Sequence, residues 1–365
     1  MINWWNTTPT KSDQKSVGDA VANRALSEGI VSARVEAKIA TLMGAKYCVL
    51  TPSGSAALAL SLMALGVKSG DSVGVPATTW VATASAVTIL GAKPILIDVE
   101  SERPVIGPTS LRNINPTSLK ALIVVHLNGI PVKIDDIRRL PGWEVIPIIE
   151  DSCQAFGSSY YGRCLGSIGD LGCFSFGVTK LLTSGQGGAV ITSSGTLNNA
   201  LRLAKNNGVI DIVNPEYLST GFNFKYSDIL ASFLESQLNQ FWPKIEHLQR
   251  VYQIYCEKLN FEFFELLDIP IKSGSIPLYA QARFKRGSRA TLIEIAANHG
   301  IDLRPYAPSL VCNPHIESKK ENFPNSIYFS EGFFYLPSGY QNLFEVEKLC
   351  SVINEIARKN ADEIL

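Results

Sequence analysis

The chain has 365 residues, of which 46% are hydrophobic and 18% charged, and its 33 basic residues equal its 33 acidic residues. This composition predicts a globular enzyme of two domains and excludes a disordered chain. Because there is no basic excess, we expect neither nucleic acid nor an anionic membrane as the main partner. The seven scattered cysteines contain no CxxC pair, so no metal site and no disulfide framework are expected.

The sequence also gives expectations about location. The first twenty residues lack the apolar segment of a signal peptide, and no later apolar run reaches the length of a membrane span. Small, unpaired cysteines are typical of a reducing compartment. We therefore expect a cytoplasmic protein that does not enter a membrane.

Helices and strands alternate in the first part of the chain. Apolar residues recur at helical spacing from 15 to 43. The elements expected next are strands at 44–54, 71–77, 93–100, 121–129 and 144–151, with helices at 55–67 and 78–92. The last two strands are continuous apolar runs, typical of strands covered on both faces. This order predicts an α/β fold with a mainly parallel sheet, whose ligands bind at the carboxyl ends of the strands.

The pattern changes at about residue 240. The elements expected from there are helices at 241–267, 288–300 and 342–361 and a strand at 277–286. They predict a smaller α+β domain at 241–365 that follows a large domain at 1–240. The domain boundary at residue 240 is predicted only from this change in the order of helices and strands.

Four features near predicted strand ends are candidates for a site. Ser53–Ser55 precedes a helix, so its backbone N–H groups could hold a phosphate, with an ordinary N-cap as the alternative. Trp80 could stack on a flat ring or lie in the core. Glu150–Asp151 closes a strand, where the acid could face a cofactor or cap the next helix. Lys180 lies in an otherwise uncharged stretch, where its amine reaches water or serves in chemistry.

One cofactor accounts for these four features together. Pyridoxal phosphate needs a lysine for a Schiff base, an acid for its pyridine nitrogen, a flat cover for its ring and N–H and hydroxyl groups for its phosphate. Lys180 would be the lysine, Asp151 the acid and Trp80 the cover. A surface lysine that extends to water remains the alternative reading of Lys180.

At these residues the chain resembles the sugar aminotransferases of the DegT/DnrJ/EryC1/StrS family. Residues 53–100 resemble the family's phosphate loop and aromatic segment, and 149–192 resemble its acid-to-lysine core. Residues 221–238 are similar to the segment that reaches into the neighbouring subunit. The resemblance runs from about residue 15 to residue 240 and continues more weakly beyond. It implies the type I fold of pyridoxal phosphate-dependent transferases, a mainly parallel sheet wrapped by helices with a smaller C-terminal α+β domain.

The resemblance also implies roles for residues around the cofactor ring. Lys180 would form the Schiff base and move protons between the substrate carbon and the cofactor. Asp151 would pair with the pyridine nitrogen, and Gln154 would contact the side of the ring that carries the hydroxyl group. Trp80 would stack on the ring.

The phosphate contacts implied by the resemblance come from two subunits. Gly54, Ser55 and Ser175 would hold the phosphate in one subunit. Asn223 would add a contact from the other, which makes a homodimer necessary for activity. No metal is implied.

Three departures from the family pattern concern the donor and the acceptor. Gln186 stands where the family more often has an acid. Lys225 stands where many members have an arginine near the substrate or donor carboxylate, and a lysine there gives a point charge in place of a bidentate fork. Residues 301–316 resemble members with an Arg-Pro pair, yet a histidine common a few residues on is replaced near Val311 and Cys312.

The leading hypothesis is a homodimeric pyridoxal phosphate-dependent aminotransferase. It would move the amino group of L-glutamate to a nucleotide-linked keto-deoxy sugar, at C4 of a 4-keto-6-deoxy sugar rather than at C3, for a surface polysaccharide, lipopolysaccharide or other glycan. The alternatives are amination at C3 of a keto sugar, a keto-cyclitol acceptor and a non-catalytic scaffold that binds the cofactor. Since a dehydratase branch of the family carries histidine in place of the lysine, Lys180 favours an aminotransferase.

Overall fold

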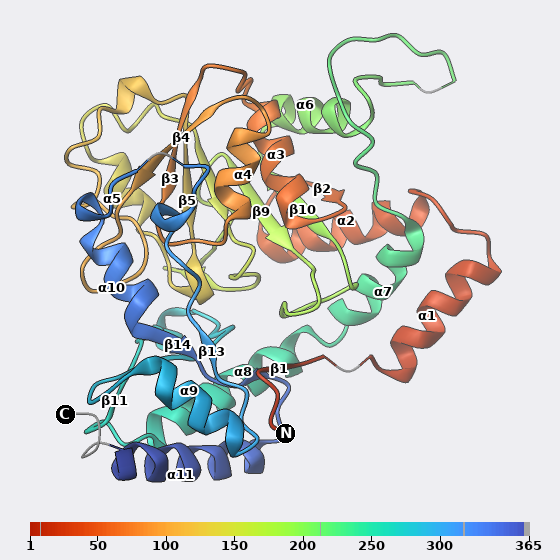
Figure 1. The fold of residues 1–365 in the computed structure, drawn as a ribbon. Helices are drawn as coiled ribbons and strands as arrows, with labels where there is room; N and C mark the ends of the chain where they lie inside the picture. The colour runs from red at the N-terminus through yellow and green to blue at the C-terminus, as the bar shows by residue number, and fades with distance from the viewer. Residues whose placement is uncertain (8, 212, 317, 361–365) are drawn as a thin grey trace.

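The computed structural model describes residues 1–7, 9–211, 213–316 and 318–360. Figure 1 shows a large sheet with helices packed around it and, beside it, a smaller part built from a second sheet and the helices near the C-terminus. In the described residues, no helix is both long enough and apolar enough to cross a lipid bilayer.

The large sheet has seven strands in the order β2-β10-β9-β6-β5-β3-β4. Strand β10 runs antiparallel to both of its neighbours, β2 and β9, and the other pairs are parallel, so the sheet is mainly parallel. Its strands are β2 Tyr47–Thr51, β3 Ser72–Pro76, β4 Lys93–Ile97, β5 Ala121–Val125, β6 Ile148–Asp151, β9 Leu171–Ser175 and β10 Gly188–Thr192. Every residue of β5 is buried, as expected for a strand covered on both faces.

Short helices and connections surround the large sheet. The helices are α3 Gly54–Ala64, α4 Ala82–Thr88, α5 Ile134–Arg138, α6 Gly195–Lys205 and α7 Asp228–Leu238, and a small ribbon is formed by β7 Ser159–Tyr160 and β8 Arg163–Cys164. The helix predicted at 78–92 was too long at both ends, because its first four residues lie between β3 and α4 and its last four lie in the turn before β4. Short 3₁₀ helices lie at Pro116–Ser118, Leu127–Gly129, Ile271–Ser273, Leu310–Cys312 and Lys320–Asn322.

The helical stretch predicted from 15 to 43 consists of two helices, α1 Lys11–Ala22 and α2 Ile30–Met43. The second helix begins at Ile30, where Asp228 at the start of α7 accepts hydrogen bonds from the backbone N–H groups of Gly29 (2.9 Å) and Val31 (3.1 Å). A carboxylate thus caps α2 from a distant part of the chain. The spacing of apolar residues along α1 and α2 cannot reveal a cap that comes from so distant a residue.

The smaller part contains an antiparallel sheet in the order β11-β12-β14-β13. Its strands are β11 Phe264–Leu266, β12 Gln281–Phe284, β13 Arg304–Pro305 and β14 Phe333–Tyr335, and its helices are α8 Phe241–Lys258, α9 Arg289–Asn298, α10 Pro324–Gly332 and α11 Leu343–Asn360. The helix predicted at 241–267 therefore ends early. Residue Leu259 is extended, and the aromatic residues that follow pair with β12 and bury Phe264 completely.

The first residues of the chain pack with the last part. Strand β1 Trp5–Asn6 pairs in parallel with β15 Ser338–Gly339, and Ile2 forms a bridge to Ile301. The division into domains at 1–240 and 241–365 stays a prediction. In the structure, the first residues of the predicted large domain contact the smaller part.

A charged cluster links α2 to α7. Arg34 donates two hydrogen bonds of 2.7 Å to Glu235, and Lys38 donates a third of 2.7 Å. The hydrogen bonds from Arg34 and Lys38 lower the pKa of Glu235 from 4.5 to about 2, while burial acts in the opposite direction. Since the folded pKa lies below the unfolded value, this contribution to stability is full above pH 4.5 and is lost as the pH falls toward 2.

We expect the Glu235→Gln variant to be less stable than the unmodified protein at neutral pH. The difference should shrink as the pH falls from 4.5 toward 2, because protonation then removes the same charge from the unmodified protein. Urea unfolding midpoints at neutral pH and at pH 3 measure this. Glu246→Gln, at an exposed position of α8, is the control. An equal difference at both pH values would contradict the argument.

Candidate active site

A cavity of 200 Å³ lies at the carboxyl ends of the strands of the large sheet. Asp151 is the last residue of β6, Ser175 is the last of β9, and Val125 is the last of β5. The lining residues are Ser53, Gly54, Ser55, Leu58, Thr79, Trp80, Ala82, Thr83, Val125, Asp151, Cys153, Gln154, Ser175, Lys180 and Gln186. Parallel strands bring these segments together because their carboxyl ends meet at one edge.

Asp151 is buried in the wall of this cavity and has donors on both oxygens. Thr83 donates its hydroxyl to one oxygen at 2.8 Å, and the backbone N–H of Cys153 approaches the other at 3.2 Å. Since the Thr83 hydroxyl has a single hydrogen, the hydroxyl of Thr79, 2.9 Å away, must donate to Thr83. Within the described residues no lysine or arginine pairs with Asp151. Its carboxylate can therefore accept a further hydrogen bond from a cationic N–H group in the cavity.

Lys180 faces the same cavity from the loop after β9. Its backbone N–H bonds to the carbonyl of Gly177 at 3.1 Å, and its Nζ lies 5.9 Å from the centre of the Tyr279 ring. Tyr279 in turn donates its hydroxyl to the carbonyl of Thr179 at 2.7 Å. No carboxylate of the described chain forms an ion pair with Lys180, so its amine is available to an electrophile in the cavity.

The first turn of α3 forms another side of the cavity. Ser53 is the N-cap, since its hydroxyl oxygen accepts a bond of 3.1 Å from the N–H of Ala56. A Cβ atom on Gly54 would lie 2.8 Å from the sulfur of Cys153 and 3.0 Å from the Cβ of Ser175. The missing side chain thus lets the start of the helix approach the end of β9. The free N–H groups of the helix point to an anion there.

Trp80 and Gln154 complete the set at the mouth of the cavity. Trp80 is 63% exposed and lines the cavity, so an aromatic surface is open to it. The Gln154 side-chain oxygen accepts a bond of 3.1 Å from the N–H of Asn128. This contact fixes the amide and leaves its NH₂ group as a donor.

A second cavity, of 670 Å³, adjoins the first and shares four lining residues with it: Thr79, Trp80, Gln154 and Lys180. Its wall contains four aromatic side chains in contact with each other, Trp4, Tyr279, Tyr306 and Tyr335. The Arg304 guanidinium lies 5.0 Å from the centre of the Trp4 ring, and Arg289 also lines the space. Cationic and aromatic groups of this kind suit an anionic ligand with a flat or apolar part.

Comparison with known proteins identifies the family. A model of the DegT/DnrJ/EryC1/StrS aminotransferase family matches residues 8–357. The chain belongs to this family. Membership confirms the family predicted from the sequence, which is described as a family of aminotransferases.

Two curated relatives of this DegT/DnrJ/EryC1/StrS member are similar over much of the chain. GDP-perosamine synthase from Escherichia coli O157:H7 is 32% identical over 236 residues, or 64% of this chain and 64% of the relative. Protein MosB from Rhizobium meliloti is 36% identical over 333 residues, or 82% of this chain and 66% of the relative. The chain therefore spans less than two thirds of the length of each.

Solved structures support the predicted fold. The aminotransferase TlmJ from Streptoalloteichus hindustanus superposes with a TM-score of 0.91, over 99% of this chain and 100% of that chain, at 24% identity. The fold class predicted from the sequence, a mainly parallel sheet wrapped by helices, is confirmed.

The residues of this family member fit the predicted cofactor. Seven residues predicted from the sequence line the 200 Å³ cavity together: Gly54, Ser55, Trp80, Asp151, Gln154, Ser175 and Lys180. The cavity offers an unpaired amine, a buried carboxylate and a helix N-terminus, the three groups that an aldehyde, a pyridine nitrogen and a phosphate require. In the described residues no group of three or more His, Cys, Asp or Glu side chains suits a metal ion.

One predicted residue lies elsewhere. Asn223 is exposed, pairs with Asn206 in an isolated bridge and does not line the cavity of its own chain. Its contact across a dimer therefore remains a prediction. The roles of the other site residues are likewise predictions, taken up below.

Sequence reasoning missed two parts of the site. Thr83, the donor to Asp151, follows Thr79 by four residues, a spacing that the sequence contains. The aromatic wall of the larger cavity has no such signal, because Trp4, Tyr279 and Tyr335 come from three distant segments.

Proposed function

We propose that this protein moves the amino group of L-glutamate to the keto carbon of a nucleotide-linked keto-deoxy sugar. The observation that carries the proposal is the meeting of Lys180, Asp151 and Trp80 in one cavity that adjoins a larger one lined by Arg289 and Arg304. The smaller cavity suits the cofactor, and the larger suits a ligand with phosphate groups and a ring. The name of the relative GDP-perosamine synthase supports a nucleotide-linked acceptor.

The residues of the chain divide the work. Pyridoxal phosphate, when bound, withdraws electrons from the carbon that carries the amino group. Lys180 would carry a proton between that carbon and the cofactor during amino transfer, and Asp151 would keep the pyridine nitrogen protonated by accepting its hydrogen bond. Trp80 covers the ring and Gln154 donates to the hydroxyl side. Lys180 lines both cavities, so the donor and the acceptor would reach the same amine in turn.

The phosphate is held by Gly54, Ser55 and Ser175 in this proposal, with Asn223 added from a second copy in a homodimer. The residues before Asn223 support such an interface, because Ile210, Val213 and Tyr217 are each at least 78% exposed. Figure 1 shows the chain between α6 and α7 projecting away from the rest of the molecule. A sedimentation mass of one chain, under conditions of turnover, would contradict the homodimer.

The position of amination is proposed as C4, from the Arg304–Pro305 pair that resembles C4-aminating members. The proposed setting is cytoplasmic synthesis of a surface polysaccharide or lipopolysaccharide sugar. Lys225 would bind the donor carboxylate as a point charge.

The test is a panel of UDP-, dTDP- and GDP-linked 4-keto and 3-keto sugars with L-glutamate, each with its free sugar and a keto-cyclitol beside it. We expect a product whose mass shows one keto group replaced by one amine, and only with a nucleotide-linked sugar. Equal turnover of free and nucleotide-linked sugar would favour the cyclitol alternative. Cofactor binding without turnover of any acceptor would favour the scaffold.

A further inference from the structure

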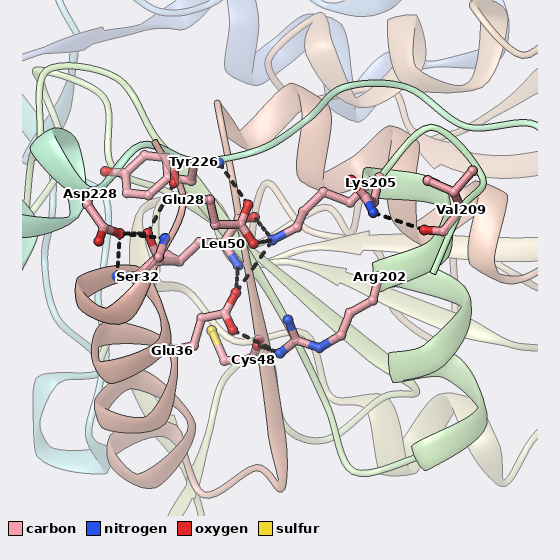
Figure 2. A network of polar contacts seen from close by, with 12 residues as sticks. Glu28, Ser32, Glu36, Cys48, Leu50, Arg202, Lys205, Val209, Tyr226 and Asp228 are labelled. Atoms are coloured by element: carbon pink, nitrogen blue, oxygen red, sulfur yellow. Dashed lines mark hydrogen bonds and ion pairs between the residues drawn. The ribbon is translucent and has the colours of Figure 1, made fainter. Parts of the chain in front are cut away.

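Lys205, the last residue of α6, is a buried cation outside the cofactor cavity. Its side chain is 3% exposed, and its Nζ lies 2.8 Å from Glu28 and 3.7 Å from Glu36. Glu36 also accepts hydrogen bonds from the Leu50 N–H at 2.9 Å and from Arg202 at 2.8 Å. Figure 2 shows this group of two cations and two carboxylates between α2, β2 and α6. Burying charges costs free energy unless they are paired, so each position is constrained by its partners.

The Lys205 side of this group also contacts the stretch Phe224–Tyr226. The backbone carbonyl of Lys205 accepts the Phe224 N–H at 3.0 Å. The second oxygen of Glu28 accepts the Tyr226 N–H at 3.3 Å, as Figure 2 shows. Lys205 thus holds both ends of the stretch. It contacts Phe224 through its backbone carbonyl, and it reaches Tyr226 through the ion pair of its side chain with Glu28.

Tyr226 connects this stretch to the rim of the cofactor cavity. Its side chain is 1% exposed, and its hydroxyl donates to the hydroxyl of Ser184, which donates to the carbonyl of Gln186 at 2.7 Å. Gln186 lines the cavity. Burial raises the pKa of the Tyr226 hydroxyl, with the Ser184 bond acting against it, so the hydroxyl stays a donor. A Cβ atom on Gly187 would lie 2.9 Å from the Tyr226 hydroxyl oxygen, which shows how closely the ring packs on this loop.

We propose that Lys205 is a positioning residue for the cofactor cavity. Its ion pair with Glu28 sets the Phe224–Tyr226 stretch, and Tyr226 then holds the Ser184–Gln186 loop at the rim. The inference rests on the proposed function, because it takes the cavity to be the pyridoxal phosphate site. It goes beyond that function by assigning a role to a residue that does not line the cavity.

The chain offers a matched control for a merely structural role. Arg202 lies three residues before Lys205 on α6 and pairs with the same Glu36. Its hydrogen bonds go to Glu36 and to the Cys48 carbonyl, and none goes to residues 224–226. Arg202→Met therefore removes one charge of the group and leaves the path to Tyr226 in place.

The test is the dissociation constant of pyridoxal phosphate, measured by equilibrium dialysis of the full-length protein. We expect Lys205→Met to raise it about tenfold, within the usual range for coupled sites. Tyr226→Phe, which keeps the ring and removes the hydroxyl, should raise it by a similar factor. Because both changes break one path, the double variant should bind no more than about tenfold more weakly than the unmodified protein. The dissociation constant of Arg202→Met should lie within twofold of that of the unmodified protein, even if its melting temperature falls as far as that of Lys205→Met.

Two results would overturn the inference. One is an equal loss of affinity in Arg202→Met and Lys205→Met, which would make the effect general destabilisation. The other is unchanged affinity in Tyr226→Phe, a variant that keeps every charge and remains informative if Lys205→Met fails to fold. Failure of the unmodified protein to bind pyridoxal phosphate would instead refute the proposed function.

Discussion

Replacing Lys180 by alanine lowers the turnover number of amino transfer by at least about 1,000-fold, the scale of a lost acid–base group. The reason is geometric, because Lys180 faces both cavities and no carboxylate of the described chain pairs with it. Borohydride treatment of the unmodified holoenzyme should leave the cofactor attached to the peptide that contains Lys180. Turnover and the peptide mass after digestion measure the two effects.

The Lys180→Arg variant separates the amine from its charge. Arginine keeps a cation near the Tyr279 ring but stays protonated, so it neither attaches the cofactor nor moves the proton. We expect it to be as inactive as Lys180→Ala. Retained turnover in either variant, or a borohydride-stable label on Lys225 in the unmodified enzyme, would refute the assignment.

The parts of the site that sequence reasoning reached are those fixed by the ends of strands. Ser175 was reached only through the family resemblance, whereas Asp151 closes an apolar run, and parallel strands bring such ends to one edge of the sheet. Gly54 and Ser55 follow β2 at the start of a helix by the same logic. The type of element and the order of residues were sufficient for these positions, and the family resemblance assigned roles to them.

The parts that were missed depend on contacts between distant segments. The break between α1 and α2 is stabilised by Asp228, some two hundred residues along the chain. Helix α8 ends at Lys258 because Phe264 pairs across to β12, a sheet partner that periodicity does not reveal. The larger cavity draws Trp4 from the N-terminus and Tyr335 from β14, brought together by the pairing of β1 with β15.

Replacing Asp151 by asparagine should lower the turnover number by about 100- to 1,000-fold while the cofactor still binds covalently to Lys180. Asparagine has nearly the same shape and can still accept from Thr83, but it carries no charge to keep a pyridine nitrogen protonated. Turnover of glutamate alone in single-turnover conditions measures the loss, and borohydride labelling of Lys180 shows that the cofactor is retained.

The Thr83→Val variant is the matched control for Asp151. It removes the 2.8 Å hydrogen bond to the carboxylate and keeps the charge, so we expect a loss of only about tenfold. The order of the two effects distinguishes the charge of Asp151 from its orientation. If Thr83→Val is as damaging as Asp151→Asn, orientation dominates and the charge is secondary. If Asp151→Asn keeps full turnover, the carboxylate does not act on the cofactor ring at all, and the acid must be sought among the other residues of the cavity.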